Sequence, residues 1–186
     1  MKTINFILLF SFLLGGVVAQ SEKTSKELKK EASLKKKEAR NAKLEKEFAL
    51  TAALLDSQSF VLEAQTLGNR EGERRPAPSN LNFIMVDSTH GVIQVGSTWR
   101  VGMNDVGGIT LDGTITSWKL TKNPKNKTFD LFMTIITKIG TYDIFMTVGT
   151  SGNASATISG FTSSKLIFDG NLVSLEESGV YKGRSF

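Results

Sequence analysis

The chain has 186 residues, a formal net charge of +5, one histidine and no cysteine. Without cysteine it can form no disulfide, no thiolate metal site, no thiol nucleophile and no lipid-modified N-terminal cysteine. One histidine is too few for a zinc site that has only His and Cys ligands. The length is that of one domain with an appendage, and the apolar content of 40% is enough to bury a real core.

Positive charge is concentrated near the N-terminus. Residues 20–47 hold ten Lys or Arg and six Asp or Glu, whereas residues 81–186 hold nine and eight. The sequence pI of about 9.4 therefore reflects the N-terminal segment and not a basic face on the rest of the chain. Because the aromatic residues lie mainly in the neutral part, we expect no nucleic acid partner.

The first nineteen residues have the pattern of a secretory signal peptide. Lys2 precedes a long apolar run, and the small residues Val17 and Ala19 stand where signal peptidase reads the chain. The run is short for a transmembrane helix, so a retained anchor is the less favoured alternative. We expect cleavage after Ala19, export to the periplasm or outer surface without a lipid anchor, and no transmembrane span in the mature chain.

Residues 20–47 predict a charged helical segment, and residues 48–186 a single β-rich domain. From Ser21 to Leu55 there is no Gly or Pro, and good helix formers dominate. Up to Glu47 the apolar residues are too sparse for a buried stripe, so a solvated spacer is favoured over a surface that binds anionic lipid or polymer. The segment FALTAALL, from Phe48, is apolar on nearly all sides, which predicts a helix end packed against the domain.

The next elements are predicted from short apolar runs. SFVLEAQTL indicates a first strand, and GNREGERRPAPSN, with Arg74 near its middle, a mobile polar loop. Residues 83–87 and 92–97 predict a hairpin whose tip, STHG, contains His90 as a turn residue. The Gly107–Gly108 pair that follows indicates a bulge or a close approach of backbone.

Residues 109–158 predict the centre of the domain, an antiparallel β meander. The segments GGITLDGTITSWKL, KTFDLFMTIITKIG, TYDIFMTVGTSG and NASATISGF favour extended structure and end in Gly, Asn or Pro. The predicted fold class is therefore mainly β: a meander forming a curved sheet, barrel or sandwich, with one N-terminal helix packed by its C-terminal end. The closing segment SKLIFDGNLVSLEESGVYKG predicts two short strands around a turn at residues 169–171.

Two segments of the meander carry apolar residues on both faces. Alternate residues form one apolar face at 129–135 and another at 142–148, yet further apolar side chains lie on the opposite faces. We expect the helix end to cover this outer stripe, which extends toward Phe161; an exposed docking face is the alternative. The candidate docking or helix-covered stripe comprises Phe48, Leu55, Phe132, Ile136 and Phe145.

Several motifs match a known family in order and spacing. LDSQSFVLEAQTL, NFIMVDSTHGVIQVGS, NDVGGITLDGTITSWKL, ISGF and LVSLEESGVYKG resemble the exported Bacteroidetes proteins grouped as domain of unknown function 4251, over residues 55–183. The resemblance implies a periplasmic or surface-associated, mainly β domain, and it carries over no catalytic residues. The sequence DST at residues 87–89 is similar to the short O-glycosylation acceptor of such proteins, although an ordinary turn at Ser88 is favoured.

Catalytic arrangements find little support in the sequence. A Ser–His pair would need His90, which lies in the predicted hairpin tip. Acidic residues beside Gly or Asn are typical turn formers, so a glycosidase-like carboxylate pair is not expected. We therefore predict no enzyme, no metal site and no cofactor.

The function we expect is an exported, non-catalytic binding or scaffolding module of the bacterial cell envelope, with an envelope protein or a glycan as partner. The alternative is a carrier of a small apolar ligand inside a lipocalin-like curved sheet, since closed barrels of about eight strands can hold one small ligand. The oligomeric state and the choice between barrel and sandwich stay open at this point.

Overall fold

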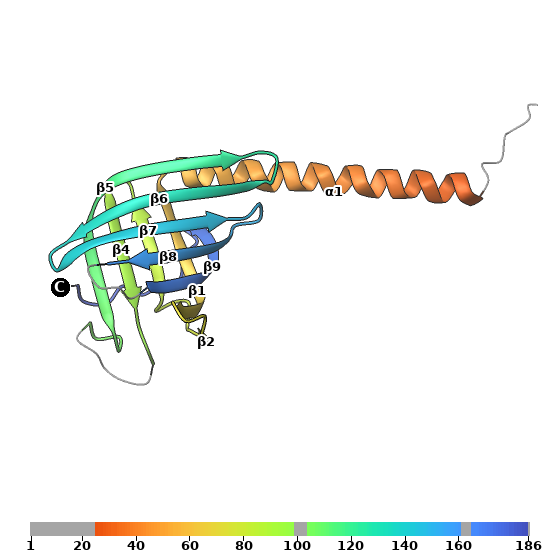
Figure 1. Cartoon of the computed structure of the whole chain (residues 1–186). Helices are drawn as coiled ribbons and strands as arrows, with labels where there is room; N and C mark the ends of the chain where they lie inside the picture. Colours follow the sequence, from red (N-terminus) through yellow and green to blue (C-terminus); the bar gives the residue numbers. More distant parts are fainter. Residues whose placement is uncertain (1–24, 99–103, 161–164, 186) are drawn as a thin grey trace, which may run out of the picture. The chain divides into compact units, whose positions relative to one another are not determined.

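The computed structural model describes residues 25–98, 104–160 and 165–185, and within them the protein is mainly β with one N-terminal helix (Figure 1). The predicted signal peptide at residues 1–19 and the stripe residue Phe161 lie outside the described residues. The chain divides into two units between Ala39 and Arg40. No helix of the described ranges combines the length and apolarity that crossing a bilayer requires.

The residues of α1 (Ser25–Asp56) are helical, as their run of helix formers predicts. In the unit that ends at Ala39 its side chains are almost all exposed, and Glu31 pairs with Lys35 one turn later at 3.5 Å. In the second unit the helix gains buried side chains, Thr51 and Leu55. No residue from 25 to 47 is buried and both buried residues come after Phe48, so the two predicted halves of the helix differ in burial as their apolar content indicates.

Nine strands of the described chain form one antiparallel sheet. Their bounds are β1 (Ser59–Asn69), β2 (Arg74–Pro76), β3 (Phe83–Asp87), β4 (His90–Val95), β5 (Ile109–Asn123), β6 (Thr128–Thr137), β7 (Gly140–Val148), β8 (Asn153–Ser159) and β9 (Lys165–Ser174). Pairing of β9 with β1 closes eight of them into a barrel, and β2 is an extra strand beside β1 (Figure 1). The predicted meander is confirmed, and closure makes the sheet a barrel and not a sandwich.

Apolar side chains from every wall fill the barrel interior. The predicted inner faces of β6 and β7 are confirmed, because alternate residues of both strands are fully buried there. The largest fully buried side chains that the strands contribute to this core are Phe60, Leu62, Ile84, Phe129, Leu131, Met133, Ile135, Ile144, Met146 and Phe168.

The C-terminal end of α1 joins the same core. Phe48 stacks on Phe129 with ring centroids 4.6 Å apart, and Leu55 is fully buried in the core cluster. The Thr51 hydroxyl donates a 2.8 Å hydrogen bond to the carbonyl oxygen of Thr150, in the β7–β8 turn. The helix end therefore packs at the end of the barrel where the inner faces of the strands finish.

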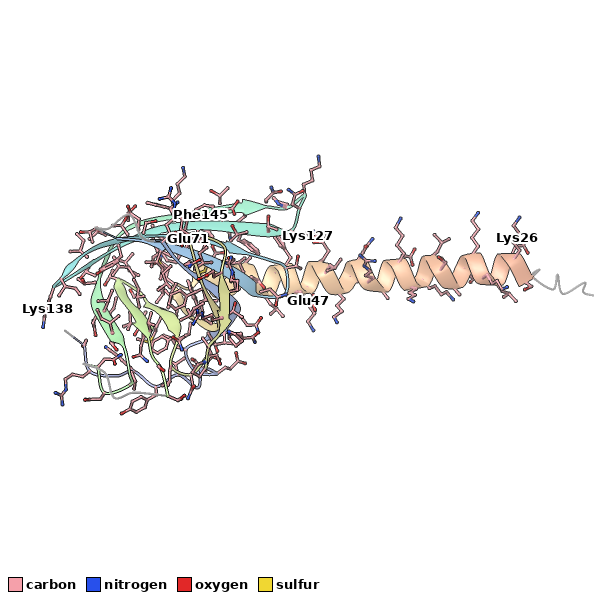
Figure 2. The ribbon with its side chains drawn as sticks, turned by 60° about the horizontal axis from the view of Figure 1, so that its bottom comes forward. Lys26, Glu47, Glu71, Lys127, Lys138 and Phe145 are labelled. Carbon is pink, nitrogen blue, oxygen red and sulfur yellow. The ribbon has the colours of Figure 1, made fainter. Side chains whose placement is uncertain are left out.

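Ion pairs hold the helix to the β5–β6 hairpin at that end. Lys127 Nζ lies 2.6 Å from Glu45 Oε1, and Lys122 Nζ lies 2.5 Å from Asp56 Oδ2. Figure 2 shows the β5–β6 turn with Lys127 and the helix residue Glu47 at the same end of the barrel. These exposed pairs each contribute at most about 1 kcal/mol, so the stacked and buried apolar side chains dominate the attachment.

The expected cover of the outer stripe by the helix end is not what the structure shows. Phe132, Ile136 and Phe145 are 38%, 48% and 50% exposed on the outer wall, whereas the helix end meets the inward-facing Phe129. The physical reason is the short connection: α1 ends at Asp56 and β1 begins at Ser59, so the last helical turn stays at the barrel end.

Two residues expected in loops belong to strands. Arg74 opens β2, and its Nε lies 2.7 Å from Asp169 Oδ2 on β9. The hairpin tip between β3 and β4 is Ser88–Thr89, so His90 is the first residue of β4, and its Nε2 lies 2.8 Å from Asp112 Oδ1. Cross-strand partners that are distant in sequence thus order both residues.

The predicted turn at residues 169–171 is also wrong, since these residues lie inside the continuous strand β9. A Cβ atom on Gly170 would stand 1.9 Å from the carbonyl oxygen of Glu63, so only glycine permits this approach of β9 to β1. The register of β1 shifts between Ala64 and Thr66 at the same place, which is a β-bulge. A Cβ atom on Gly108 would stand 2.0 Å from the carbonyl oxygen of Val95. The close approach of backbone predicted for the Gly107–Gly108 pair is therefore confirmed.

A buried glutamine holds the C-terminal tail, residues 175–185, against the outer wall near β4. The Gln94 amide nitrogen donates to the carbonyl oxygens of Leu81 and Tyr181 at 3.1 and 2.8 Å. Its side-chain oxygen accepts the Gly183 N–H at 2.7 Å and the Thr110 hydroxyl at 2.9 Å. Gln94 is fully buried, and these four bonds use all the hydrogen-bonding capacity of its amide.

Asn104 extends this network along the tail. Its side chain donates to the Thr110 hydroxyl at 3.0 Å and accepts the N–H groups of Val106 and Gly108, while its carbonyl oxygen accepts the Arg184 N–H at 3.0 Å. Beside the network, Val61, Phe83 and Val92 form a small apolar cluster on the outer wall, and Leu175 and Val180 of the tail pack against it. The tail thus covers one part of the outer wall.

We predict that Leu55→Ala lowers the free energy of unfolding by about 2–5 kcal/mol, because it empties a fully buried site in the barrel core. Leu50→Ala is the matched control in the same helix, since Leu50 is 62% exposed, and it should change stability by less than about 0.5 kcal/mol. Urea unfolding followed by circular dichroism measures both. Equal midpoints for the two variants would contradict the attachment described above.

We predict that Gln94→Ala lowers stability by about 3 kcal/mol and speeds proteolytic cleavage of the tail, because several buried partners of its amide lose their hydrogen bonds. Gln65→Ala, at an exposed position on β1, is the control and should leave both quantities unchanged. Urea midpoints and limited proteolysis read by intact mass give the answer. Tail cleavage at the wild-type rate in Gln94→Ala would show that the tail is held by other contacts.

Candidate functional site: an aromatic pair on the outer wall

Two phenylalanines face outward side by side on the barrel. Phe132 of β6 and Phe145 of β7 are directly opposite in the antiparallel register, which puts their Cβ atoms about 5 Å apart. They are 38% and 50% exposed, and Figure 2 labels Phe145 at the barrel surface. Each lies on the solvent face because its neighbours along the strand occupy the core face.

The pair is the middle of a row that crosses five strands. Cross-strand partners from β5 to β9 define this aromatic row, whose members are Lys119, Phe132, Phe145, Thr157 and Ile167. Neighbouring strands are about 4.8 Å apart, so the row is about 19 Å long. The sheet thus presents the two rings within an extended surface and not at an isolated tip.

Polar side chains flank the aromatic row on both sides. The register places two outward-facing flanking rows, one formed by Ser117, Thr134, Asp143, Ser159 and Lys165, the other by Thr121, Asp130, Thr147, Ser155 and Asp169. All ten residues are polar, and most carry a hydroxyl group. Between the two flanking rows, the exposed apolar side chains therefore lie in the aromatic row alone.

Hydrogen bonds hold the carboxylates of the flanking rows in place. The Thr134 hydroxyl donates to Asp143 Oδ1 at 2.8 Å, and the Thr147 hydroxyl donates to Asp130 Oδ1 at 3.0 Å. Among the described residues, no hydrogen bond or ion pair engages Oδ2 of either carboxylate. Each carboxylate is thus oriented by its neighbour while one oxygen stays available to a ligand.

Two shallow hollows lie beside the aromatic pair, and both rings line each of them. The first, of about 380 Å³, is lined by Phe132, Asp143, Phe145, Thr157, Ser159 and Lys165. The second, of about 550 Å³, is lined by Ser117, Lys119, Thr121, Asp130, Phe132 and Phe145. The rings therefore form a low ridge between two hydroxyl-rich and charged depressions.

The structure separates the five candidate residues of the stripe. Phe48 and Leu55 belong to the barrel-end contact of the helix, and only Phe132 and Phe145 form a contiguous exposed pair. Ile136 lies four residues further along β6, about 13 Å away, opposite Thr141. The flanking rows could not be predicted from the sequence, because they come from five strands and the local sequence does not show the register between strands.

The barrel interior offers less to a ligand than its outer wall. Phe60, Phe129 and Phe168 project into the core from three strands and are fully buried. A further cleft, of about 330 Å³, lies on the β1–β2 side and includes Leu67, Arg75 and Gly96 among its lining residues. Within the described ranges, no three His, Cys, Asp or Glu side chains are grouped so that they could hold a metal ion.

Comparison with known proteins places this barrel in a family. The family described as "Domain of unknown function (DUF4251)" matches residues 42–172, from the packed part of α1 into β9. The chain belongs to the DUF4251 family. This confirms the resemblance seen in the motifs.

A solved DUF4251 structure has the same fold. It is the crystal structure of a DUF4251 family protein from Bacteroides eggerthii DSM 20697, which is 32% identical to this chain and has a TM-score of 0.61. The similarity covers 75% of this chain and 95% of that chain. No curated protein matches the chain. The DUF4251 barrel is compatible with a lipocalin-like binding module.

We predict that Phe132→Ala changes the free energy of unfolding by less than about 1 kcal/mol, the scale of one cross-strand pair, because the ring is 38% exposed on the outer wall and lies outside the buried core. Phe129→Ala, on the same strand but facing inward, should lower it by about 3–5 kcal/mol. Urea unfolding of the two variants compares outer and inner faces of β6 directly. A loss above about 2 kcal/mol for Phe132→Ala would mean that the ring is covered after all.

Proposed function

We propose that this DUF4251 protein is an exported, non-catalytic binding module of the bacterial cell envelope and that the aromatic row is its docking face. The observation that carries the proposal is the exposed Phe132–Phe145 pair on a barrel whose interior is filled by its own side chains. Export is supported by the N-terminal apolar run that ends at Ala19.

The energetics of the pair favour a docking role. Two half-exposed phenylalanines at the centre of an outer wall bring no folding benefit comparable with that of core residues. If a partner buries the part of each ring that is still exposed, each contributes about 0.5–1.5 kcal/mol of hydrophobic free energy, part of which offsets the entropy lost on association. Aromatic anchors within a polar rim are also the usual arrangement of binding sites.

The carrier alternative has weaker support. A ligand inside the barrel would need the volume now occupied by the rings of Phe60, Phe129 and Phe168. The helix end adds Phe48 and Leu55 to the same core. The outer wall, in contrast, requires no rearrangement before it meets a partner.

The proposal predicts saturable binding to the envelope of the producing cells through the aromatic pair. Fluorescently labelled mature protein is titrated onto isolated envelopes, in parallel with the double variant Phe132→Ala, Phe145→Ala. We expect the double variant to bind at least tenfold more weakly, which equals about 1.4 kcal/mol.

A matched control removes exposed apolar side chains elsewhere. Ile139 and Tyr181 are 52% and 62% exposed outside the aromatic row, and the double variant Ile139→Ala, Tyr181→Ala should bind like the wild type. Circular dichroism confirms that both variants are folded. Unchanged envelope affinity after loss of both phenylalanines would overturn the docking face.

A further inference from the structure

We infer that the ligand of the aromatic row is a neutral glycan chain. The inference rests on the proposed docking face and specifies the chemical class of the molecule that binds there. Its basis is the combination of an aromatic pair, two hydroxyl-rich flanking rows and a local charge balance on one outer wall.

The apolar area at this site is small for a protein partner. A stable protein interface covers about 800 Å² on each side and has an apolar core. Here two phenylalanine rings, each offering at most about 250 Å², are bordered on both sides by polar rows. Ile136, the next large exposed apolar residue along β6, is too far away to enlarge the patch.

The exposed rings fit the apolar face of a sugar. A pyranose ring turns several C–H groups toward one side, and these carry a small positive charge. The face of an aromatic ring is negative, so C–H groups stack on it favourably, through weak contacts that add up over two adjacent rings. Phe132 and Phe145, placed next to each other on neighbouring strands, offer two such platforms in line.

The flanking rows fit the hydroxyl groups at the edge of a sugar. Hydroxyls both donate and accept hydrogen bonds, so they need partners of both kinds. Thr157, Ser159 and Lys165 supply donors in one hollow, and Ser117, Lys119 and Thr121 supply them in the other. The oriented carboxylates of Asp143 and Asp130 supply an acceptor in each hollow.

Charge balance favours a neutral ligand. Lys165 and Asp143 line one hollow, and Lys119 and Asp130 line the other, so each hollow has no net formal charge. Asp169, at the far end of a flanking row, is paired with Arg74. A polyanion such as nucleic acid or an acidic lipid surface would meet a fixed carboxylate in either hollow.

The first test asks which envelope component the docking face recognises. Labelled protein is titrated onto envelopes that are untreated, oxidised with periodate, or digested with protease. Periodate cleaves vicinal diols of sugars, so it should weaken binding at least tenfold, whereas protease digestion should leave the affinity within threefold of that for untreated envelopes.

The outcomes separate the two levels of the proposal. Binding that depends on Phe132 and Phe145 but survives periodate and is lost after protease would contradict the glycan inference. The docking face would then be retained, with a protein as its partner. Binding that is indifferent to the two phenylalanines would overturn the docking face itself.

The second test addresses ligand charge and the flanking rows. Glycans released from the same envelopes are divided by anion exchange into a neutral and an acidic pool, and each pool is titrated against the protein by calorimetry. We expect the neutral pool to bind and Asp143→Asn to weaken that binding at least threefold. Asp105→Asn, an exposed carboxylate outside the flanking rows, is the control and should change nothing. Binding of the acidic pool alone would contradict the inference.

Discussion

The pairing of β9 with β1 is the constraint on which the rest of the structure depends. It converts a meander of hydrogen-bonded neighbours into a closed barrel. In a closed barrel, each side chain of a strand points either into the core or out to the surface. The close approach requires the missing side chain of Gly170 and the bulge of β1 between Ala64 and Thr66. Without closure, the edges of β1 and β9 would present unpaired backbone groups to solvent.

Closure also decides which side chains are exposed on the outer wall. Inward positions are taken by large side chains from several walls, and the helix end adds Phe48 and Leu55 at one end of the barrel. Another part of the outer wall is covered by the C-terminal tail, which the buried amide of Gln94 fixes through four hydrogen bonds. On the outer faces of β5 to β9 an aromatic pair lies between polar side chains, which is why we propose the docking role for this part of the wall.

The chemistry of this face comes from register more than from any local motif. Phe132 and Phe145 are thirteen positions apart in the chain and meet only because β6 and β7 are paired with those two residues opposite. The same register assembles hydroxyls and carboxylates from five strands into two lines. If any of these strands shifted by one residue against its neighbour, its residues of the flanking rows would face the core and not the solvent.

Much of the fold could be predicted from the sequence because strand and helix periodicity are local. The alternation at residues 129–135 and 142–148 identified the inner faces, the run FALTAALL identified the packed helix end, and the order of motifs identified the DUF4251 family. The candidate stripe was predicted only in part. Its outward phenylalanines were visible in the alternation, whereas the helix end meets Phe129 inside the barrel and not the stripe outside.

The sequence by itself determined the N-terminal helix, most of the strands, and the core-facing sides of the strands at residues 129–135 and 142–148. Only the tertiary structure decided that the sheet closes, that residues 165–174 form one strand, that β2 pairs with β1, and that two phenylalanines stand between polar rows. The physical reason is the range of the interactions. Propensity and alternation act over a few residues, whereas closure and register depend on contacts between residues about a hundred positions apart, such as Gly170 and Ala64.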